Sequence, residues 1–144
     1  MGKEQFIGSW KLISSEYRSD DGEVIHPMGR QVQGRLSYDA QGYMLVQHMS
    51  ANRPRFASED YMRATPAEVQ AAFHSSRAYY GTYDVDDEKR TVTHHVEGAS
   101  IPNWKGQDNV RFFQLAGKRL TLTTPPQLID GKYRVGRLVW ERLD

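Results

Sequence analysis

The residue of this sequence best suited to acid–base chemistry is His94, in the stretch Val92-Thr93-His94-His95-Val96. Side chains alternate between the two faces of a β-strand, so His94 shares a face with Val92 and Val96, and His95 points the other way. We therefore expect His94 to face the interior of the fold. Burial in an apolar cavity lowers the pKa of an imidazole, which could then accept a proton near neutral pH. The alternative interpretation is a core histidine hydrogen-bonded to a backbone carbonyl or a hydroxyl.

Further side chains could line the same interior, and each has a structural interpretation beside the functional one. The register of residues 43–49 and 109–115 stays open, because apolar residues occur on both faces of these stretches. Trp104, which follows Pro102 and Asn103, could line the mouth of a cavity or pack over its own loop. With His94, the predicted ligand-binding residues are Glu16, His48, Tyr83, Trp104, Arg111, Phe112 and Phe113.

Several kinds of site are excluded or disfavoured. The sequence has no cysteine, so it offers no disulfide, thiol nucleophile or cysteine metal ligand. The five histidines lack the HExxH or a similar spacing, and the adjacent His94 and His95 point to opposite faces. We find no GxSxG, phosphate-loop or dinucleotide motif. We therefore predict no metal and no cofactor.

Length and charge restrict the class of protein. The 144 residues are predicted to form one domain, residues 1–144, with a single core. The formal charge of +1 comes from 19 basic and 18 acidic residues mixed along the chain, which argues against nucleic acid or a membrane as partner. The sequence shows neither a signal-peptide pattern nor an apolar run long enough to span a membrane. We expect a cytoplasmic protein, either a monomer or a homodimer.

The elements that must position these residues are mostly strands with short connections, which favours an up-and-down barrel. Eight strands enclose room for one small ligand. The predicted fold is all-β: a closed or nearly closed antiparallel barrel of eight strands, and possibly up to ten. Strands are expected at about residues 9–18, 31–38, 43–49, 80–86, 91–97, 109–115, 120–124 and 138–142.

One helix is expected between the third and fourth of these strands. Thr65-Pro66-Ala67-Glu68 combines an N-cap hydroxyl, a proline at the first helical position and a glutamate that can reach back. An apolar stripe at helical spacing follows, with Gly81 as its stop signal. The stripe consists of Val69, Ala72, Phe73, Ser76 and Tyr80.

Trp10 is predicted to plug one end of the barrel. If the first and last strands pair antiparallel, Arg142 reaches the same end as Trp10, where its guanidinium can cover the indole. Trp140, two residues before Arg142, shares its face and belongs to the same closing group. In the alternative interpretation, both tryptophans are ordinary core residues and Arg142 is a solvated terminal charge.

Four motifs occur in order along the chain: Gly8-Ser9-Trp10-Lys11-Leu12, Tyr80-Gly81-Thr82-Tyr83-Asp84-Val85-Asp86, His94-His95-Val96-Glu97-Gly98 with Pro102-Asn103-Trp104, and Trp140-Glu141-Arg142. Together they resemble those of the bacterial and fungal lipocalin-like domain family, small relatives of the calycin barrels. The resemblance covers about residues 6–143 and implies a barrel with an internal cavity for a small molecule, but no reaction. The chain lacks the Thr-Asp-Tyr motif, the cysteine pair and the final helix of secreted lipocalins, which argues against a secreted carrier.

The leading hypothesis is a protein that binds a small apolar or aromatic molecule, such as a lipid-like compound or a secondary metabolite. The alternative is a cofactor-free isomerase, cyclase or dehydratase with His94 as general acid or base. A third interpretation is a haem-binding or metal-binding barrel with His94 or His48 as ligand.

Overall fold

The computed structural model describes residues 2–144, and ten strands of this part of the chain form one antiparallel sheet. The sheet order is β2-β1-β3-β4-β5-β6-β7-β8-β10-β9, and β1 also pairs with β10, which closes the sheet into an eight-stranded barrel flanked by β2 and β9. The strands are β1 (Gly8–Ser19), β2 (Val24–Ile25), β3 (Val32–Tyr38), β4 (Tyr43–Ser50), β5 (Ser76–Asp86), β6 (Thr91–Ala99), β7 (Asp108–Ala116), β8 (Arg119–Thr123), β9 (Gln127–Ile129) and β10 (Lys132–Leu143). The predicted barrel is thus confirmed.

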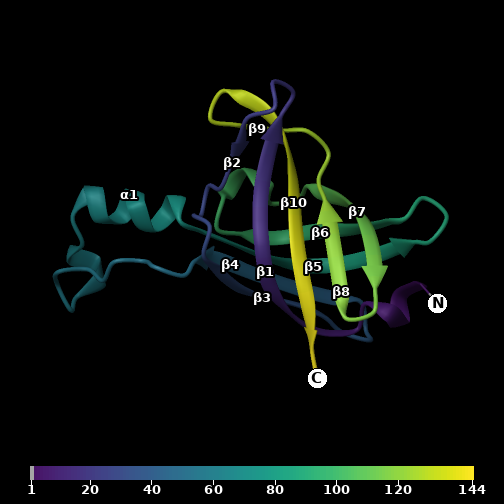
Figure 1. The fold of residues 1–144 in the computed structure, drawn as a ribbon. Helices are drawn as coiled ribbons and strands as arrows, with labels where there is room; N and C mark the ends of the chain where they lie inside the picture. Colours follow the sequence, from purple (N-terminus) through teal and green to yellow (C-terminus); the bar gives the residue numbers. More distant parts are fainter. Residues whose placement is uncertain (1) are drawn as a thin grey trace.

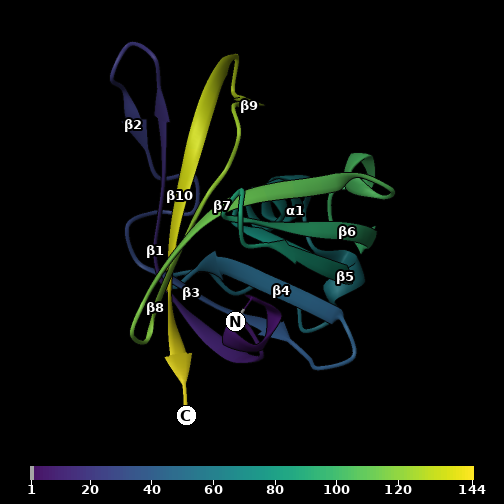
Figure 2. The same ribbon diagram turned by 90° about the vertical axis from the view of Figure 1, so that its right-hand side faces the viewer.

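The closing pair of strands is long and contains one irregularity. Ser9 pairs with Leu143 at one end and Ser19 with Arg134 at the other, and the register shifts between Leu12 and Ser14. Beyond this shift, β1 and β10 continue past the rest of the barrel, flanked by the short strands β2 and β9 (Figures 1 and 2). The bulge matters because it changes which residues of β1 face inward.

The predicted position of the helix among the strands is wrong. Helix α1 (Pro66–His74) lies between β4 and β5, because Val24 and Ile25 form an additional short strand outside the eight expected ranges. The expected N-cap is present: Thr65 accepts from the backbone N–H of Glu68, and the Glu68 carboxylate accepts from that of Thr65.

The helix is also shorter than its stripe suggests. It ends at His74, and β5 begins at Ser76, so the stripe residues Ser76 and Tyr80 belong to a strand. Tyr80 pairs with Leu45 in the sheet, which shows that strand pairing overrides the helical spacing here. Arg77 donates to the carbonyl oxygens of Phe73 and His74, and so satisfies the end of the helix.

Helix α1 buries no residue and lies outside the barrel (Figure 1). Two 3-10 turns, η2 (Tyr61–Arg63) and η3 (Pro102–Trp104), lie in the connections before α1 and after β6. No helix in residues 2–144 has the length and apolar character needed to cross a membrane.

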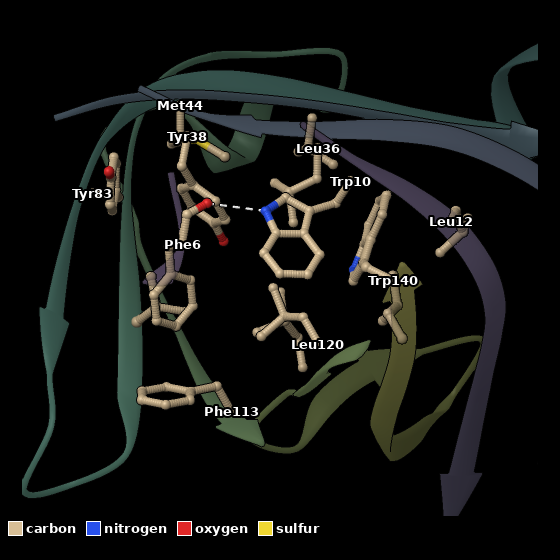
Figure 3. Close-up of a cluster of buried hydrophobic side chains, with 14 of the residues drawn as sticks. Phe6, Trp10, Leu12, Leu36, Tyr38, Met44, Tyr83, Phe113, Leu120 and Trp140 are labelled. Atoms are coloured by element: carbon tan, nitrogen blue, oxygen red, sulfur yellow. Dashed lines mark hydrogen bonds between the residues drawn. The ribbon is translucent and has the colours of Figure 1, made fainter. Parts of the chain in front are cut away.

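One end of the barrel is closed by the N-terminal segment. After the short turn η1 (Gly2–Gln5), Phe6 packs edge-on against Tyr38 and Phe113, with ring centroids 5.5 Å and 4.9 Å apart. The indole Nε1 of Trp10 donates to the carbonyl oxygen of Phe6 at 3.0 Å, so the buried indole has its hydrogen-bond partner (Figure 3). We call this group of buried side chains, together with Arg142, the floor.

Arg142 covers the floor from outside. Its guanidinium carbon lies 4.2 Å from the centroid of the Trp10 ring, and it donates to the carbonyl oxygens of Ile7, at 2.7 Å, and Gln5. Gly8 makes this approach possible: its φ is +131°, and a Cβ there would lie 2.8 Å from an Arg142 nitrogen.

On the outer face, His95 joins three strands. Its Nε2 and Nδ1 lie 2.7 Å from carboxylate oxygens of Asp84 on β5 and Asp108 on β7. The hydrogen bond to Asp108, followed by that to Asp84, raises the pKa of His95 above its usual 6.5. The protonated imidazole can donate to both carboxylates at once.

Replacing Arg142 with Met should lower the free energy of unfolding by about 2 kcal/mol, because it removes a cation–π contact and leaves two carbonyl groups without a donor. Urea unfolding followed by circular dichroism measures this loss. Arg137→Met, on the exposed side of the same strand, is the matched control and should change little. Equal effects of the two substitutions would show that the floor does not depend on Arg142.

Replacing Asp108 with Asn should lower the pKa of His95, as measured by NMR titration of its ring protons. A raised pKa means that the folded state gains protons relative to the unfolded state. The stabilisation by His95 is therefore complete below pH 6.5 and disappears as the pH rises through the folded-state value. Asp20→Asn, on an exposed turn, is the control. A His95 pKa that is unchanged in the Asp108 variant would contradict the bridging arrangement.

Candidate functional site

Above the floor, the barrel contains a cavity of about 800 Å³. Its wall carries aromatic, apolar and a few polar side chains from most of the barrel strands. The wall residues are Tyr17, Leu36, Val46, His48, Arg77, Tyr79, His94, Gln107, Arg111, Leu122, Thr124, Leu138 and Trp140. The mouth lies among residues 25–28, the end of α1, residues 101–104 and residues 127–130.

His94 lies at the inner part of this wall, held between two tyrosines. Its Nε2 is 2.7 Å from the hydroxyl of Tyr38, and its Nδ1 is 2.6 Å from the hydroxyl of Tyr79. The three side chains come from β3, β5 and β6, and all of them are buried. Both ring nitrogens therefore have partners within the protein.

The protons of this network can be ordered. Asn109 and Arg111 lie close to Tyr79 and lower its pKa, against the larger effect of burial. A neutral imidazole donates from one ring nitrogen and accepts at the other, so one tyrosine hydroxyl accepts from His94 and the other donates to it. The neutral imidazole is the form that fits this order.

Burial sets the ionisation of the network. It lowers the pKa of His94 to about 3, with smaller contributions from the positive charges of Arg111 and His95. Burial also raises the pKa of Tyr38 and Tyr79, and the charge of Arg111 opposes this rise. At neutral pH the three side chains are therefore uncharged.

Two polar atoms of the wall have no hydrogen-bond partner. They are Nδ1 of His48 and Nε1 of Trp140, whose rings lie edge to face with centroids 6.4 Å apart. Burial, together with the charges of Arg77 and Arg111, lowers the pKa of His48 to about 4. Because unsatisfied buried polar groups are costly, this pair lowers the stability of the wall.

The structure distributes the predicted ligand-binding residues over three places. His48, His94, Trp104 and Arg111 line the cavity. Tyr83 and Phe113 are buried in and around the floor, where the Tyr83 hydroxyl donates to the carbonyl oxygen of Asp39.

Two of the predicted residues lie outside the barrel. Phe112 is 48% exposed, because β7 turns Arg111 and Phe113 inward. Glu16 does not line the cavity, because the bulge after Leu12 places Tyr17 inward instead. The Glu16 carboxylate lies 3.7 Å from the Arg18 guanidinium, outside the cavity.

The three residues predicted to close the barrel lie in two different places. Trp10 and Arg142 belong to the floor, whereas Trp140 lines the cavity above it. Trp104 lies at the mouth, with its ring centroid 5.8 Å from that of Tyr79 in an edge-on contact. Trp104 and Trp140 thus lie at the mouth and in the wall of the same cavity.

The sequence analysis missed Tyr17, Tyr38, Arg77 and Tyr79 as site residues. Tyr38 could have been found, because alternation places it on one face with Leu36. Tyr79 and Arg77 fell within the expected helix, and Tyr17 was hidden by a bulge that leaves no clear sequence signal. Within residues 2–144, no group of three His, Asp or Glu side chains is placed to hold a metal ion.

Comparison with known proteins gives the same architecture. A family model described as a lipocalin-like domain matches residues 7–143. The 4'-hydroxy-3'-methoxypropiophenone carrier protein ppsC of Aspergillus oryzae (strain ATCC 42149 / RIB 40) is 31% identical over 107 residues, which are 69% of this chain and 96% of that protein. No solved structure matches the chain significantly. The match to the family model extends over nearly the whole barrel, and the chain therefore belongs to the family of lipocalin-like domains.

Proposed function

We propose that this protein binds a small, predominantly apolar aromatic molecule in the cavity of its barrel. The observation that carries the proposal is the cavity of about 800 Å³, which is within the usual size range of small-molecule sites. The cavity offers aromatic rings on which a flat ligand can stack. They belong to Trp104 at the mouth and to Tyr17 and Trp140 in the wall.

The relative from Aspergillus oryzae supports this class of ligand. That protein is named as a carrier of 4'-hydroxy-3'-methoxypropiophenone, which is a hydroxylated and methoxylated aryl ketone. A ligand of this kind combines an aromatic body with oxygen atoms that accept hydrogen bonds. In this chain, Arg111 in the cavity wall is a donor from which such an oxygen could accept a hydrogen bond.

The alternative function is a cofactor-free isomerase, cyclase or dehydratase. The hydrogen-bonded series Tyr79, His94 and Tyr38 is the observation that favours it, because such a series can move a proton. However, both nitrogens of His94 are occupied, so a substrate would have to exchange protons through Tyr79. The raised pKa of Tyr79 and the lowered pKa of His94 keep the proton on the phenol at neutral pH, which favours binding over catalysis.

Filling the cavity should weaken binding. Val46 and Leu122 both line it, and the double substitution Val46→Trp and Leu122→Trp should weaken binding of 4'-hydroxy-3'-methoxypropiophenone by at least about tenfold, or about 1.4 kcal/mol. Isothermal titration calorimetry measures the affinity, and circular dichroism verifies the fold. Each single substitution gives a milder test, because extra volume in a buried wall costs stability.

The matched control moves the same two tryptophans by one residue each. Leu45→Trp with Thr121→Trp places them at positions outside the cavity lining, so binding should remain within about twofold of the original chain. Equal affinities of the inward and outward double variants would place the ligand outside the barrel and refute the proposal.

His94 should remain neutral from pH 7 down to about pH 4.5, as measured by NMR of its ring nitrogens, because burial lowers its pKa to about 3. The unfolded state binds this proton more readily, so the protein should lose stability as the pH falls below 6.5. His94→Gln should lack this part of the pH dependence in urea unfolding. A His94 that titrates near pH 6.5 would contradict the neutral network and favour the enzyme.

A further inference from the structure

Arg111 places a positive charge in the cavity wall without a carboxylate to balance it. The side chain is 9% exposed, and one of its terminal nitrogens donates to the backbone carbonyl oxygen of Val110 at 3.0 Å. Its charge also lowers the pKa of Tyr79, against the larger effect of burial. None of the ion pairs among residues 2–144 includes Arg111.

Arg134, the other buried arginine among residues 2–144, has a carboxylate beside it. Arg134 is 3% exposed, and its guanidinium lies 3.0 Å from a carboxylate oxygen of Glu23 and donates to the carbonyl oxygen of Ile129. Arg134 therefore has an anion beside it, whereas Arg111 has neutral groups. A buried charge normally has a counter-charge, because burial removes the water that would stabilise it. Within residues 2–144, no carboxylate forms an ion pair with Arg111 to serve as its counter-charge.

Arg77 adds a second positive charge to the same wall. Its Nη1 donates to backbone carbonyl oxygens at the end of α1, and it forms no ion pair with a described residue. Of the cavity-lining residues within residues 2–144, Asp130 at the mouth is the only one with a carboxylate. The inner wall is thus positive, and its two histidines do not change this at neutral pH.

We propose that the ligand of this cavity carries an anionic group on its aromatic body, and that Arg111 binds this group as its counter-charge. A carboxylate, a sulfonate or an ionised phenol has the required chemistry. The inference rests on the proposed function, because it assigns a ligand class to the same cavity. Arg77 strengthens the attraction from the side of the mouth, and the aromatic rings hold the rest of the molecule.

An anion fits this site better than a neutral oxygen. A planar guanidinium bonds most strongly to a negatively charged oxygen, and such charge-assisted bonds are about twice as strong as neutral ones. Because Arg111 is largely shielded from water, such a pair would be screened less than one on the protein surface. A neutral ligand would leave the Arg111 charge uncompensated.

Two fluorescent probes with the same aromatic skeleton test the inference. 8-Anilinonaphthalene-1-sulfonate carries a sulfonate, and N-phenyl-1-naphthylamine lacks it. We expect the original chain to bind the sulfonate probe at least about tenfold more tightly than the neutral probe. Arg111→Met should remove this difference by weakening the sulfonate probe about tenfold, while the affinity for the neutral probe stays within about threefold.

Two further variants make the comparison specific. Arg111→Lys keeps the charge and should retain part of the preference for the sulfonate probe. Arg35→Met removes a positive charge from the exposed face of β3 and should leave both affinities unchanged. The ratio of the two affinities in the original chain does not depend on whether Arg111→Met folds.

The outcomes separate the two proposals. Binding of both probes with equal affinity, or an equal loss of both in Arg111→Met, would overturn the anionic ligand and leave the cavity as a binding site. Failure of both probes to bind would count against the proposed function itself, and the inference would fall with it. A preference for the sulfonate probe that disappears with Arg111 alone supports the assignment.

Discussion

The closure of the sheet by β1 and β10 is the constraint on which every other feature depends. Because these two strands pair over almost their whole length, the barrel has an inside, and its inward residues are shielded from water. The closure is fixed at one end by the stacking of Arg142 on Trp10 and by the carbonyl groups that Arg142 binds. The same end is filled by Phe6, so space remains only towards the opposite end.

The interior is therefore divided into a packed floor and a cavity with a distinct chemistry. In the floor, the polar atom of Trp10 is satisfied within the protein, whereas in the cavity wall Trp140 and His48 keep unpartnered nitrogens. The Tyr38, His94 and Tyr79 network separates the two regions and is uncharged. The positive charge of Arg111 next to this network gives the cavity its polarity. Such an interior suits the binding of a small aromatic molecule better than a dry core would.

Much of the barrel could be predicted, because its strands alternate clearly and its turns are short. His94 could be placed inward from Val92 and Val96 alone, and in the structure it is buried. The site was less predictable. The bulge after Leu12 turns Tyr17, instead of Glu16, toward the cavity. Strand β5 begins at Ser76, where the helical spacing of apolar residues predicts that the helix continues. Neither event has a strong local signal, because long-range strand pairing decides both. For the same reason, the partners of His94 on β3 and β5 became visible only with the fold.

The central claim is that a small molecule binds inside the barrel, above the floor. A crystal structure of the protein grown with 4'-hydroxy-3'-methoxypropiophenone tests it most directly. The account predicts electron density for the ligand between Trp104 and Trp140, with an oxygen atom within hydrogen-bond distance of Arg111. Ligand density on the outer surface, or a barrel interior filled by its own side chains, would contradict it.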